Sequence, residues 1–488
     1  MESPDLPAFL ERGEPARLIP VVSEGSKEQR AVSVLLATMH AVGEFGRSVL
    51  ARFDAPSGRS SRIRCYTEVC LKAPEGAPKL RPDGLIVVEQ GSKRWTALIE
   101  AKIGAAILES QQIEEYFEIA KEAGIDAIIT ISNQYSGATG GHPIALDGRK
   151  ARAVALHHIP WMSLLTEAIL LIEKDGVEDT ERAFIAREMI RYFRHEGSGV
   201  LAFGQMGPEW KELCYSIQQG LPPTKDMPSV KAAASDWLEL SRYLEMPLSL
   251  AIRHPVSVRV SREHAANPGA RATSIIDMLC QDSRLSCEFD IPDAASRLTL
   301  LADLKRRVLV ASMTIKAPSD RTRASSCVTW VLKQLEKCTD PDITVRAIWP
   351  RRIHDTMTRL ETLRGNRDAI VPADTDALPT SFEIARTVDL GAKFRSAKAF
   401  VEAAEDIAVS MYADVGQHLR AWQPSAPKIK SKAADETSGP AIPDTVPSIV
   451  PTELPAPIPA ASKAEEQVVA PIAESVSAPD EAVPPPTA

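Results

Sequence analysis

The spacing of apolar residues changes repeatedly between residues 27 and 132, and this alternation limits the possible folds more than any other feature of the chain. Apolar residues first recur at helical spacing, with Ser26 as the expected N-cap. Three short segments of strand character follow, then a second helical repeat and a final apolar run. The predicted segments are a helix over 27–53, strands over 62–71, 84–89 and 95–101, a helix over 108–123 and a strand over 127–132. The predicted order is therefore α-β-β-β-α-β, an α/β fold.

Turn residues separate these segments at the expected places. Residues 90–93, Gln-Gly-Ser-Lys, fit a hairpin turn between the second and third strands. Gly124 follows the second helix, where a glycine commonly ends helical structure. The three strands should therefore form an antiparallel meander. A further strand over 153–158 and helices over 162–174 and 181–195 would complete this layer.

Composition divides the chain into four parts. Residues 424–488 hold 14 of the 37 prolines and no aromatic residue, so we expect a disordered Pro/Ala-rich tail. The Gly-Ser-Gly sequence ending at residue 199 predicts a break between two globular blocks. The predicted domains are an N-terminal extension over 1–16, a first domain over 17–199, a mixed α/β domain over 207–423, and the tail.

The sequence also indicates where the protein is found. No run of about 18 apolar residues exists, so no membrane helix is expected. The first five residues are acidic where a signal peptide would be basic and then apolar. The seven cysteines include no Cys-x-x-Cys pair, which favours reduced thiols. We therefore expect a cytoplasmic protein with no membrane partner.

Two carboxylates and a lysine are predicted at the ends of neighbouring strands. Asp83 precedes the strand 84–89, whereas Glu100 and Lys102 close the strand that begins at residue 95. Antiparallel pairing brings the start of one strand beside the end of the next. Such an oxygen-rich site suits Mg²⁺, or Mn²⁺ as an alternative, and a lysine beside it can orient or activate water. This chemistry would serve phosphodiester hydrolysis.

The residues around these positions resemble a known family. Arg81-Pro82-Asp83-Gly84 and Ile99-Glu100-Ala101-Lys102 resemble the PD-(D/E)xK signature of the restriction-endonuclease-like nuclease superfamily. Residues 112–116, Gln-Ile-Glu-Glu-Tyr, resemble the Q-h-x-x-Y element of its RecB-like branch. The resemblance covers about residues 27–133, and the family core has the same α-β-β-β-α-β order.

That resemblance implies a role for each matching residue. It implies that Asp83 and Glu100 are metal ligands, that Lys102 is the catalytic lysine, and that Gln112 and Tyr116 support the active site. An additional upstream acid is frequent in the family. Glu68, the expected third metal ligand, and Glu44 are the candidates, and the alternative for each is a solvated charge.

The second block contains a basic region over residues 300–367, with 14 Lys or Arg against 7 acidic residues. A strand over 307–313, a helix capped by Ser319 and a strand over 343–349 are predicted there. Four arginines near element ends are candidate nucleic-acid contacts: Arg321, Arg323, Arg351 and Arg352. The alternatives are solvated charges on a second core, or a surface for a homodimer or another protein.

Three hypotheses follow. The first is a metal-dependent nuclease that cuts nucleic acid, with DNA the expected substrate, and whose second block positions substrate or partner. The alternative is a non-catalytic nucleic-acid-binding or regulatory protein that retains the fold and uses the same charges as an internal salt-bridge network. A third hypothesis, an assembly factor whose Pro-rich tail recruits a partner, is compatible with either.

Overall fold

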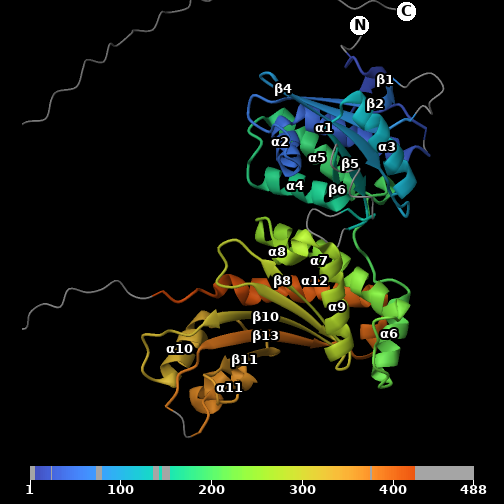
Figure 1. Ribbon diagram of the computed structural model, residues 1–488. Helices are drawn as coiled ribbons and strands as arrows, with labels where there is room; N and C mark the ends of the chain where they lie inside the picture. Colours follow the sequence, from blue (N-terminus) through green and yellow to red (C-terminus); the bar gives the residue numbers. More distant parts are fainter. Residues whose placement is uncertain are drawn as a thin grey trace, which may run out of the picture. The chain divides into compact units, whose positions relative to one another are not determined.

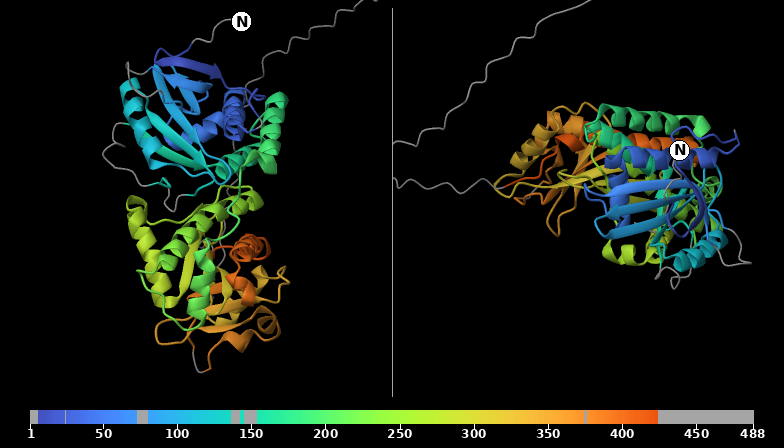
Figure 2. Two further views of the ribbon diagram at one scale, coloured as in Figure 1. Left: turned by 90° about the vertical axis from the view of Figure 1, so that its right-hand side faces the viewer. Right: turned by 90° about the horizontal axis from the view of Figure 1, so that it is seen from above.

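The computed structural model describes residues 6–23, 25–72, 80–135, 142–144, 154–373 and 376–423. The predicted disordered tail, residues 424–488, lies outside the described residues. Two separate β-sheets lie within the remainder of the chain, one in each half (Figure 1). In the views of Figure 2 the strands of the first sheet run from blue to green and those of the second from yellow to orange. The α/β class predicted from periodicity is confirmed.

The first sheet has six strands in the order β1-β2-β3-β4-β5-β6. β1 to β4 pair with one another in antiparallel fashion, whereas the β4–β5 and β5–β6 pairs are parallel. Gln90 pairs with Lys93 across the predicted hairpin turn, and Gly91 has a φ of 59°, which a glycine adopts without strain. The predicted meander is therefore confirmed. The strands are β1 (Leu10–Pro15), β2 (Arg62–Leu71), β3 (Gly84–Gln90), β4 (Lys93–Ala101), β5 (Ala127–Ser132) and β6 (Ala155–Pro160).

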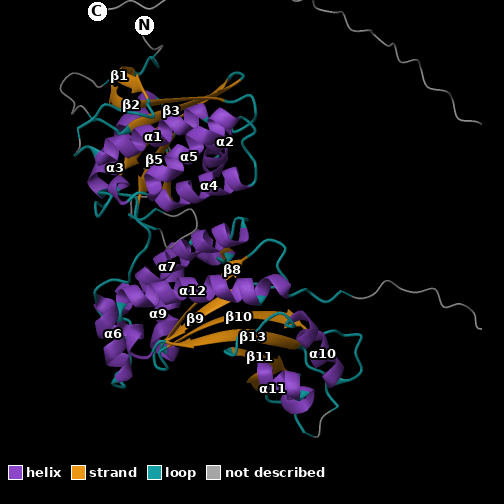
Figure 3. Ribbon diagram, turned by 180° about the vertical axis from the view of Figure 1, so that it is seen from behind, coloured by secondary structure: helices purple, strands orange, loops and turns teal. Residues whose placement is uncertain are grey.

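Helices cover both faces of this sheet because its central strands are apolar on both sides. Ile86 and Val88 of β3 pack in the same core cluster as the apolar residues of the first helix, α1. Leu85 and Val87 point to the other face and pack with Ile113 of α3. Figure 3 shows the helices beside the strands. The helices of this half are α1 (Lys27–Ala41), α2 (Gly43–Leu50), α3 (Ser110–Ala123), α4 (Trp161–Glu173) and α5 (Thr180–Arg194).

The prediction of one helix over 27–53 is wrong, because the helix breaks at Val42. This residue has φ −103° and ψ 80°, and α2 begins directly after it. A Cβ atom on Gly46 would lie 2.4 Å from the carbonyl oxygen of Met39, so the glycine allows α2 to pack tightly against the end of α1. Periodicity misses the break because Val42 at the break and Phe45 after it are both buried.

Two further expectations at the N-terminal side need correction. Residues 10–15, assigned to an extension, form β1, which pairs with β2 and extends the sheet. Ser26 precedes α1, but its hydroxyl makes no capping bond and instead lies 2.7 Å from the hydroxyl of Ser23.

The second sheet is antiparallel, with strand order β12-β11-β13-β10-β9-β8-β7. The long helices α7 and α12 pack against it, and α7 tolerates Pro247 in its interior. The strands are β7 (Ser257–Val258), β8 (Arg284–Asp290), β9 (Leu298–Asp303), β10 (Val308–Lys316), β11 (Ile343–Ile348), β12 (Thr356–Arg359) and β13 (Ser381–Asp389). The helices are α6 (Glu209–Gln218), α7 (Pro228–Ile252), α8 (Arg262–Ala266), α9 (Pro268–Asp282), α10 (Ala324–Gln334), α11 (Leu360–Gly365) and α12 (Ala397–Asp414).

The second block is therefore mixed α/β, as predicted, but one helix start differs. Ser319 does not cap α10, because that helix begins at Ala324 with Arg323 in the N-cap position. Within the described ranges, none of the helices combines the length and apolar character needed to cross a bilayer.

Candidate active site

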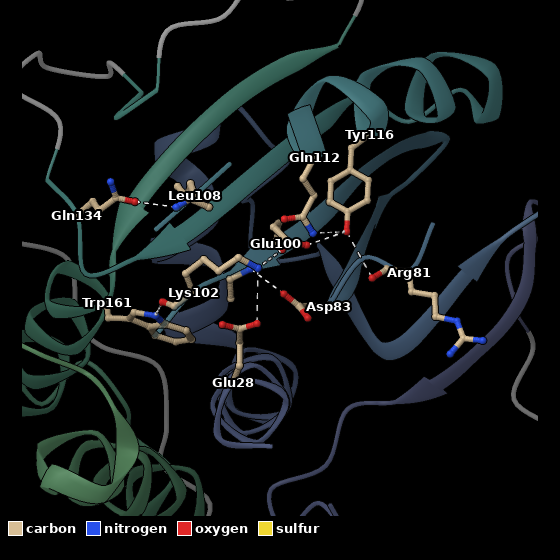
Figure 4. A network of polar contacts seen from close by, with 11 residues as sticks. Glu28, Arg81, Asp83, Glu100, Lys102, Leu108, Gln112, Tyr116, Gln134 and Trp161 are labelled. Carbon is tan, nitrogen blue, oxygen red and sulfur yellow. Dashed lines mark hydrogen bonds and ion pairs between the residues drawn. The ribbon is translucent and has the colours of Figure 1, made fainter. Parts of the chain in front are cut away.

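The structure brings Asp83, Glu100 and Lys102 together at one end of the β3–β4 hairpin (Figure 4). Gly84 pairs with Ile99, so the residue before β3 lies beside the end of β4. Asp83 Oδ2 accepts the backbone N–H of Ala101 at 2.8 Å, and Lys102 Nζ donates to Glu100 Oε1 at 2.5 Å. The hairpin register therefore places the three charged groups of the sequence motif in one cluster.

Gln112 and Tyr116 of α3 reach the same cluster. Positions four apart lie on one helix face, so both side chains leave α3 in the same direction. The Tyr116 hydroxyl donates to Glu100 Oε2 at 2.8 Å, and Gln112 Nε2 donates to the Tyr116 oxygen at 3.2 Å. The carbonyl of Arg81 is a second, more distant acceptor for this hydroxyl at 3.4 Å. Both oxygens of Glu100 thus have a donor, one from Lys102 and one from Tyr116.

A third carboxylate, which the sequence analysis missed, belongs to Glu28 in the first turn of α1. Its Oε1 lies 3.6 Å from Lys102 Nζ, on the opposite side of the lysine head from the α3 contacts (Figure 4). The only sequence signal was an acidic residue at a helix start, which is common and usually reflects the helix dipole.

The two acids proposed from sequence lie in different surroundings. Glu68 sits at a left-handed φ of 52° on β2, is exposed, and lines a cavity of about 500 Å³ that Asp83 also lines. Glu44 forms ion pairs with Arg47 and Arg182, away from the cluster. Glu28 is therefore the upstream acid that contacts Lys102, and the role of Glu68 as a third metal ligand stays a prediction.

Backbone and packing contacts fix Lys102 in position. Its N–H donates to the carbonyl of Ile131 on β5 at 2.8 Å. Its carbonyl accepts the indole N–H of Trp161 at 2.9 Å, and that indole is fully buried. The base of the lysine side chain is thus held by two elements that follow it in the chain, which limits where its ammonium group can reach.

The charges in the cluster shift one another's protonation. Burial and then the negative charge of Glu100 raise the pKa of Asp83 to about 8. Burial also raises the pKa of Glu28. Burial acts to lower the pKa of Lys102, but its hydrogen bond to Glu100 and the neighbouring carboxylates outweigh that effect and raise the pKa. Lys102 is therefore a cation among three carboxyl groups, and the cluster favours additional positive charge.

The donor set fits a hard divalent cation held by few protein ligands. Carboxylate oxygens are the ligands Mg²⁺ prefers, and Mg²⁺ is often held by only one or two carboxylates with water completing the shell. Asp83 and Glu100 supply two such groups, and the same oxygen ligands suit Mn²⁺. Across the described ranges, no three His, Cys, Asp or Glu side chains form a ready-made metal-binding group.

The four candidate arginines of the second block lie in two loops at one end of its sheet. Ser381 of β13 pairs with Lys316 on one side and with Ile348 on the other. The loops that follow β10 and β11 therefore leave the same end of the sheet. Arg321 and Arg323 lie in the first loop, Arg351 and Arg352 in the second, and all four are exposed. Arg321 lies 3.5 Å from Asp320. The arrangement permits contact with phosphates and leaves that role a prediction.

A separate polar chain crosses β5 and β6. Ile144 N–H donates to His142 Nδ1, so the proton of this neutral ring is on Nε2, 2.7 Å from the Thr130 hydroxyl oxygen. Thr130 in turn lies 2.9 Å from His158 Nδ1, and His158 Nε2 faces the carbonyl of Gln134 at 2.8 Å. Burial lowers the pKa of both histidines to about 4. With that lowered pKa, His158 is neutral at pH 7, and its Nδ1 can accept the Thr130 hydroxyl, which has the carbonyl of His157 as a second acceptor at 3.2 Å.

These hydrogen bonds predict that the folded protein becomes less stable at acid pH. His158 has a reference pKa of 6.5 and a lowered folded-state pKa of about 4, so the unfolded chain binds the proton more readily. Stability is present above pH 6.5 and is lost as the pH falls toward 4. Between pH 7 and pH 5 this one group should cost about 2 kcal/mol. Urea unfolding of wild type and His158→Asn at both pH values measures the difference. Equal losses in the two proteins would contradict the assignment.

Comparisons with known proteins identify no relative. No protein-family model matches the chain, and neither the curated proteins nor the solved structures contain a significant match. The function must therefore be argued from the site itself.

Proposed function

We propose that the protein is a metal-dependent nuclease of the PD-(D/E)xK type that hydrolyses phosphodiester bonds in nucleic acid, with DNA the substrate we expect. The observation that carries the proposal is the convergence of Asp83, Glu100 and Lys102 at the end of one hairpin. The α-β-β-β-α-β order around the hairpin and the contact from Tyr116 of α3 support it.

Asp83 and Glu100 would hold Mg²⁺, which when bound supplies Lewis-acid polarisation of a phosphoryl oxygen and a more nucleophilic water. Lys102 stays protonated and can donate a hydrogen bond to a phosphate oxygen, which stabilises the negative charge that develops during hydrolysis. Tyr116 fixes the orientation of Glu100 by binding its Oε2, and Gln112 orients Tyr116. Glu28 lies on the far side of Lys102 and helps to position its ammonium group.

One observation favours the second candidate, a non-catalytic protein that keeps this fold. Glu100 is only 2% exposed and both of its oxygens are already bonded, one to Lys102 and one to Tyr116. A static salt-bridge network would have the same contacts. The two candidates differ at Asp83, whose carboxyl has a raised pKa because it is buried beside other carboxylates. In a static network the charge of this carboxyl stays unfavourable, whereas a bound cation would stabilise it.

Cleavage assays test the proposal. Labelled single-stranded DNA, duplex DNA and RNA are incubated with Mg²⁺ or Mn²⁺, using wild type, Asp83→Ala and Lys102→Ala, with EDTA as the metal control. We expect wild type to cut at least one substrate only with metal, and both variants to be inactive. A wild-type protein that binds these substrates but cuts none would favour the second candidate.

Tyr116→Phe should reduce activity without unfolding the protein. The substitution removes only the hydroxyl that donates to Glu100, whereas the buried ring remains in place. Outer contacts of this kind are worth about 10- to 100-fold in metal affinity or activity. Cleavage rates as a function of Mg²⁺ concentration should show a raised metal requirement. Tyr215→Phe is the matched control, because it removes the same hydroxyl group from an exposed side chain on α6. An unchanged rate for Tyr116→Phe would contradict the supporting role.

A further inference from the structure

A second polar cavity lies at the opposite end of α1 from the Asp83 cluster. It has a volume of about 390 Å³ and is lined by the end of α1, the start of α2, the first residues of β2, the end of β3 and a residue of α5. Glu28 and His40 mark the two ends of α1, and twelve residues of helix span about 18 Å. The cavity is therefore a separate site from the proposed catalytic cluster.

Positive charge dominates the lining of this cavity. Four arginines line it, against a single carboxylate, Glu89. Arg64 pairs with Glu89 at 2.5 Å. Glu44, which is not a lining residue, pairs with Arg47 at 3.9 Å and with Arg182 at 3.3 Å. Arg62 makes no ion pair with any residue that the structure describes. The lining arginines are Arg47, Arg62, Arg64 and Arg182.

Two buried donors at the cavity have no hydrogen-bond partner among the described residues. Ser61 is 8% exposed and its hydroxyl is unpaired, and the Nε of Arg64 is also buried and unpaired. A buried donor without a partner costs about 1–3 kcal/mol, so a ligand that brings acceptor oxygens would recover that cost. Both donors belong to residues that line the cavity.

The helix α2 adds to the same preference. Gly43, its first residue, lines the cavity, and a Cβ there would lie 2.8 Å from Nη1 of Arg47, so the glycine lets this guanidinium lie across the helix start. Backbone N–H groups at a helix N-terminus favour anions. Guanidinium groups, a hydroxyl donor and a helix N-terminus together suit a phosphate, whose oxygens accept several hydrogen bonds.

We propose that this cavity binds a phosphate group, carried either by a nucleotide or by a nucleic-acid strand. The chemistry is the same for both sources, and the volume lies within the range of small-ligand sites. The site goes beyond the proposed nuclease activity because it uses none of the residues of the Asp83 cluster and needs no metal.

Binding to the full-length protein tests the proposal, with EDTA present throughout so that the result does not depend on catalysis. The probes are inorganic phosphate, a nucleoside triphosphate and a fluorescent single-stranded DNA, and the dissociation constant is measured by calorimetry or fluorescence anisotropy. Arg62→Glu removes a lining arginine that holds no ion pair among the described residues, so the fold should persist. Ser61→Ala removes the unpaired hydroxyl. Arg59→Glu is the matched control, because Arg59 is exposed nearby and does not line the cavity.

We expect wild type to bind at least one probe, Arg62→Glu to weaken that binding about tenfold or more, and Ser61→Ala to weaken it by a smaller factor. Arg59→Glu should change it less than twofold. Binding of the nucleotide but not DNA identifies a small-molecule site, and the reverse identifies a nucleic-acid contact; either supports the proposal. Absence of binding by all three probes, or equal weakening by Arg59→Glu and Arg62→Glu, would overturn it.

Discussion

Asp83→Asn should abolish cleavage while leaving the fold at least as stable as the wild type. The change removes one of the two carboxylates that would hold the cation, and the loss of metal-assisted catalysis should lower the rate by about 1,000-fold or more. The amide oxygen of Asn can still accept the N–H of Ala101. The carboxyl it replaces is half-buried beside Glu100, and desolvation and the charge of Glu100 raise its pKa to about 8, so the folded protein disfavours the charged form. Removing it should raise the free energy of unfolding of the metal-free protein at pH 7, by up to about 4 kcal/mol if the whole shift acts on stability.

Cleavage rates and urea unfolding in EDTA measure the two effects on the same preparations. Asp175→Asn is the matched control, because Asp175 is exposed after α4 and its left-handed φ of 51° is one that Asn also adopts. It should change neither quantity. If Asp83→Asn destabilised the protein and left cleavage intact, Asp83 would be a structural residue.

Lys102→Met should destabilise the protein, in contrast to Asp83→Asn, and like Asp83→Asn it should strongly reduce cleavage. The methionine keeps the length of the side chain but removes the charge that neutralises Glu100 and Glu28. Glu100 is almost fully buried, and removing one partner of a buried ion pair costs about 3–5 kcal/mol. Tyr116 still donates to Glu100, so we expect a loss of about 3 kcal/mol in metal-free protein. Cleavage should fall by about 100-fold or more, because in the proposed mechanism the lysine would donate to the reacting phosphate.

Adding Mg²⁺ to Lys102→Met and testing Lys102→Arg distinguish the effect of the lysine charge from the effect of its shape. Mg²⁺ should restore part of the stability of Lys102→Met, because a bound cation replaces the missing positive charge beside Glu100. Lys102→Arg keeps the charge and should retain most of the stability in EDTA, although its planar head does not match the geometry of an ammonium group. Thermal unfolding of the three proteins in EDTA and in Mg²⁺ measures this. A Lys102→Met protein as stable as wild type in EDTA would show that Glu100 does not depend on the lysine.

The sequence predicts the centre of the first sheet well because its signals there are local. The apolar runs of β2 to β5 and the glycines at positions 91 and 124 each determine structure within a few residues. The neighbouring placement of Asp83 and Glu100 follows from the hairpin register alone. These features need no knowledge of the rest of the fold.

The features that were missed depend on contacts between distant segments. The break at Val42 is tied to the packing of Gly46 on Met39, and β1 exists because its backbone pairs with β2. Glu28 joins the site only because α1 begins beside the end of β4. Apolar spacing and short motifs carry no information on such placements, so the third carboxylate could not be chosen among several acidic residues upstream of the motif.

The second sheet shows the same division. Its strands β10 and β11 follow apolar runs that sequence periodicity detects, whereas α10 starts five residues after the expected cap at Ser319. The two arginine loops lie at the same end of the sheet because β10 and β11 both pair with β13. β13 begins 65 residues beyond the end of β10. That pairing is not visible in the local sequence.

Whether Asp83 belongs to a metal-dependent nuclease site is tested by cleavage of labelled DNA with Mg²⁺ and with EDTA. The proteins are wild type, Asp83→Asn and Asp175→Asn, and their unfolding curves are measured on the same preparations. We expect wild type and Asp175→Asn to cleave only with Mg²⁺. Asp83→Asn should not cleave and should be no less stable than wild type. Metal-independent cleavage, or cleavage by Asp83→Asn at the wild-type rate, would contradict it.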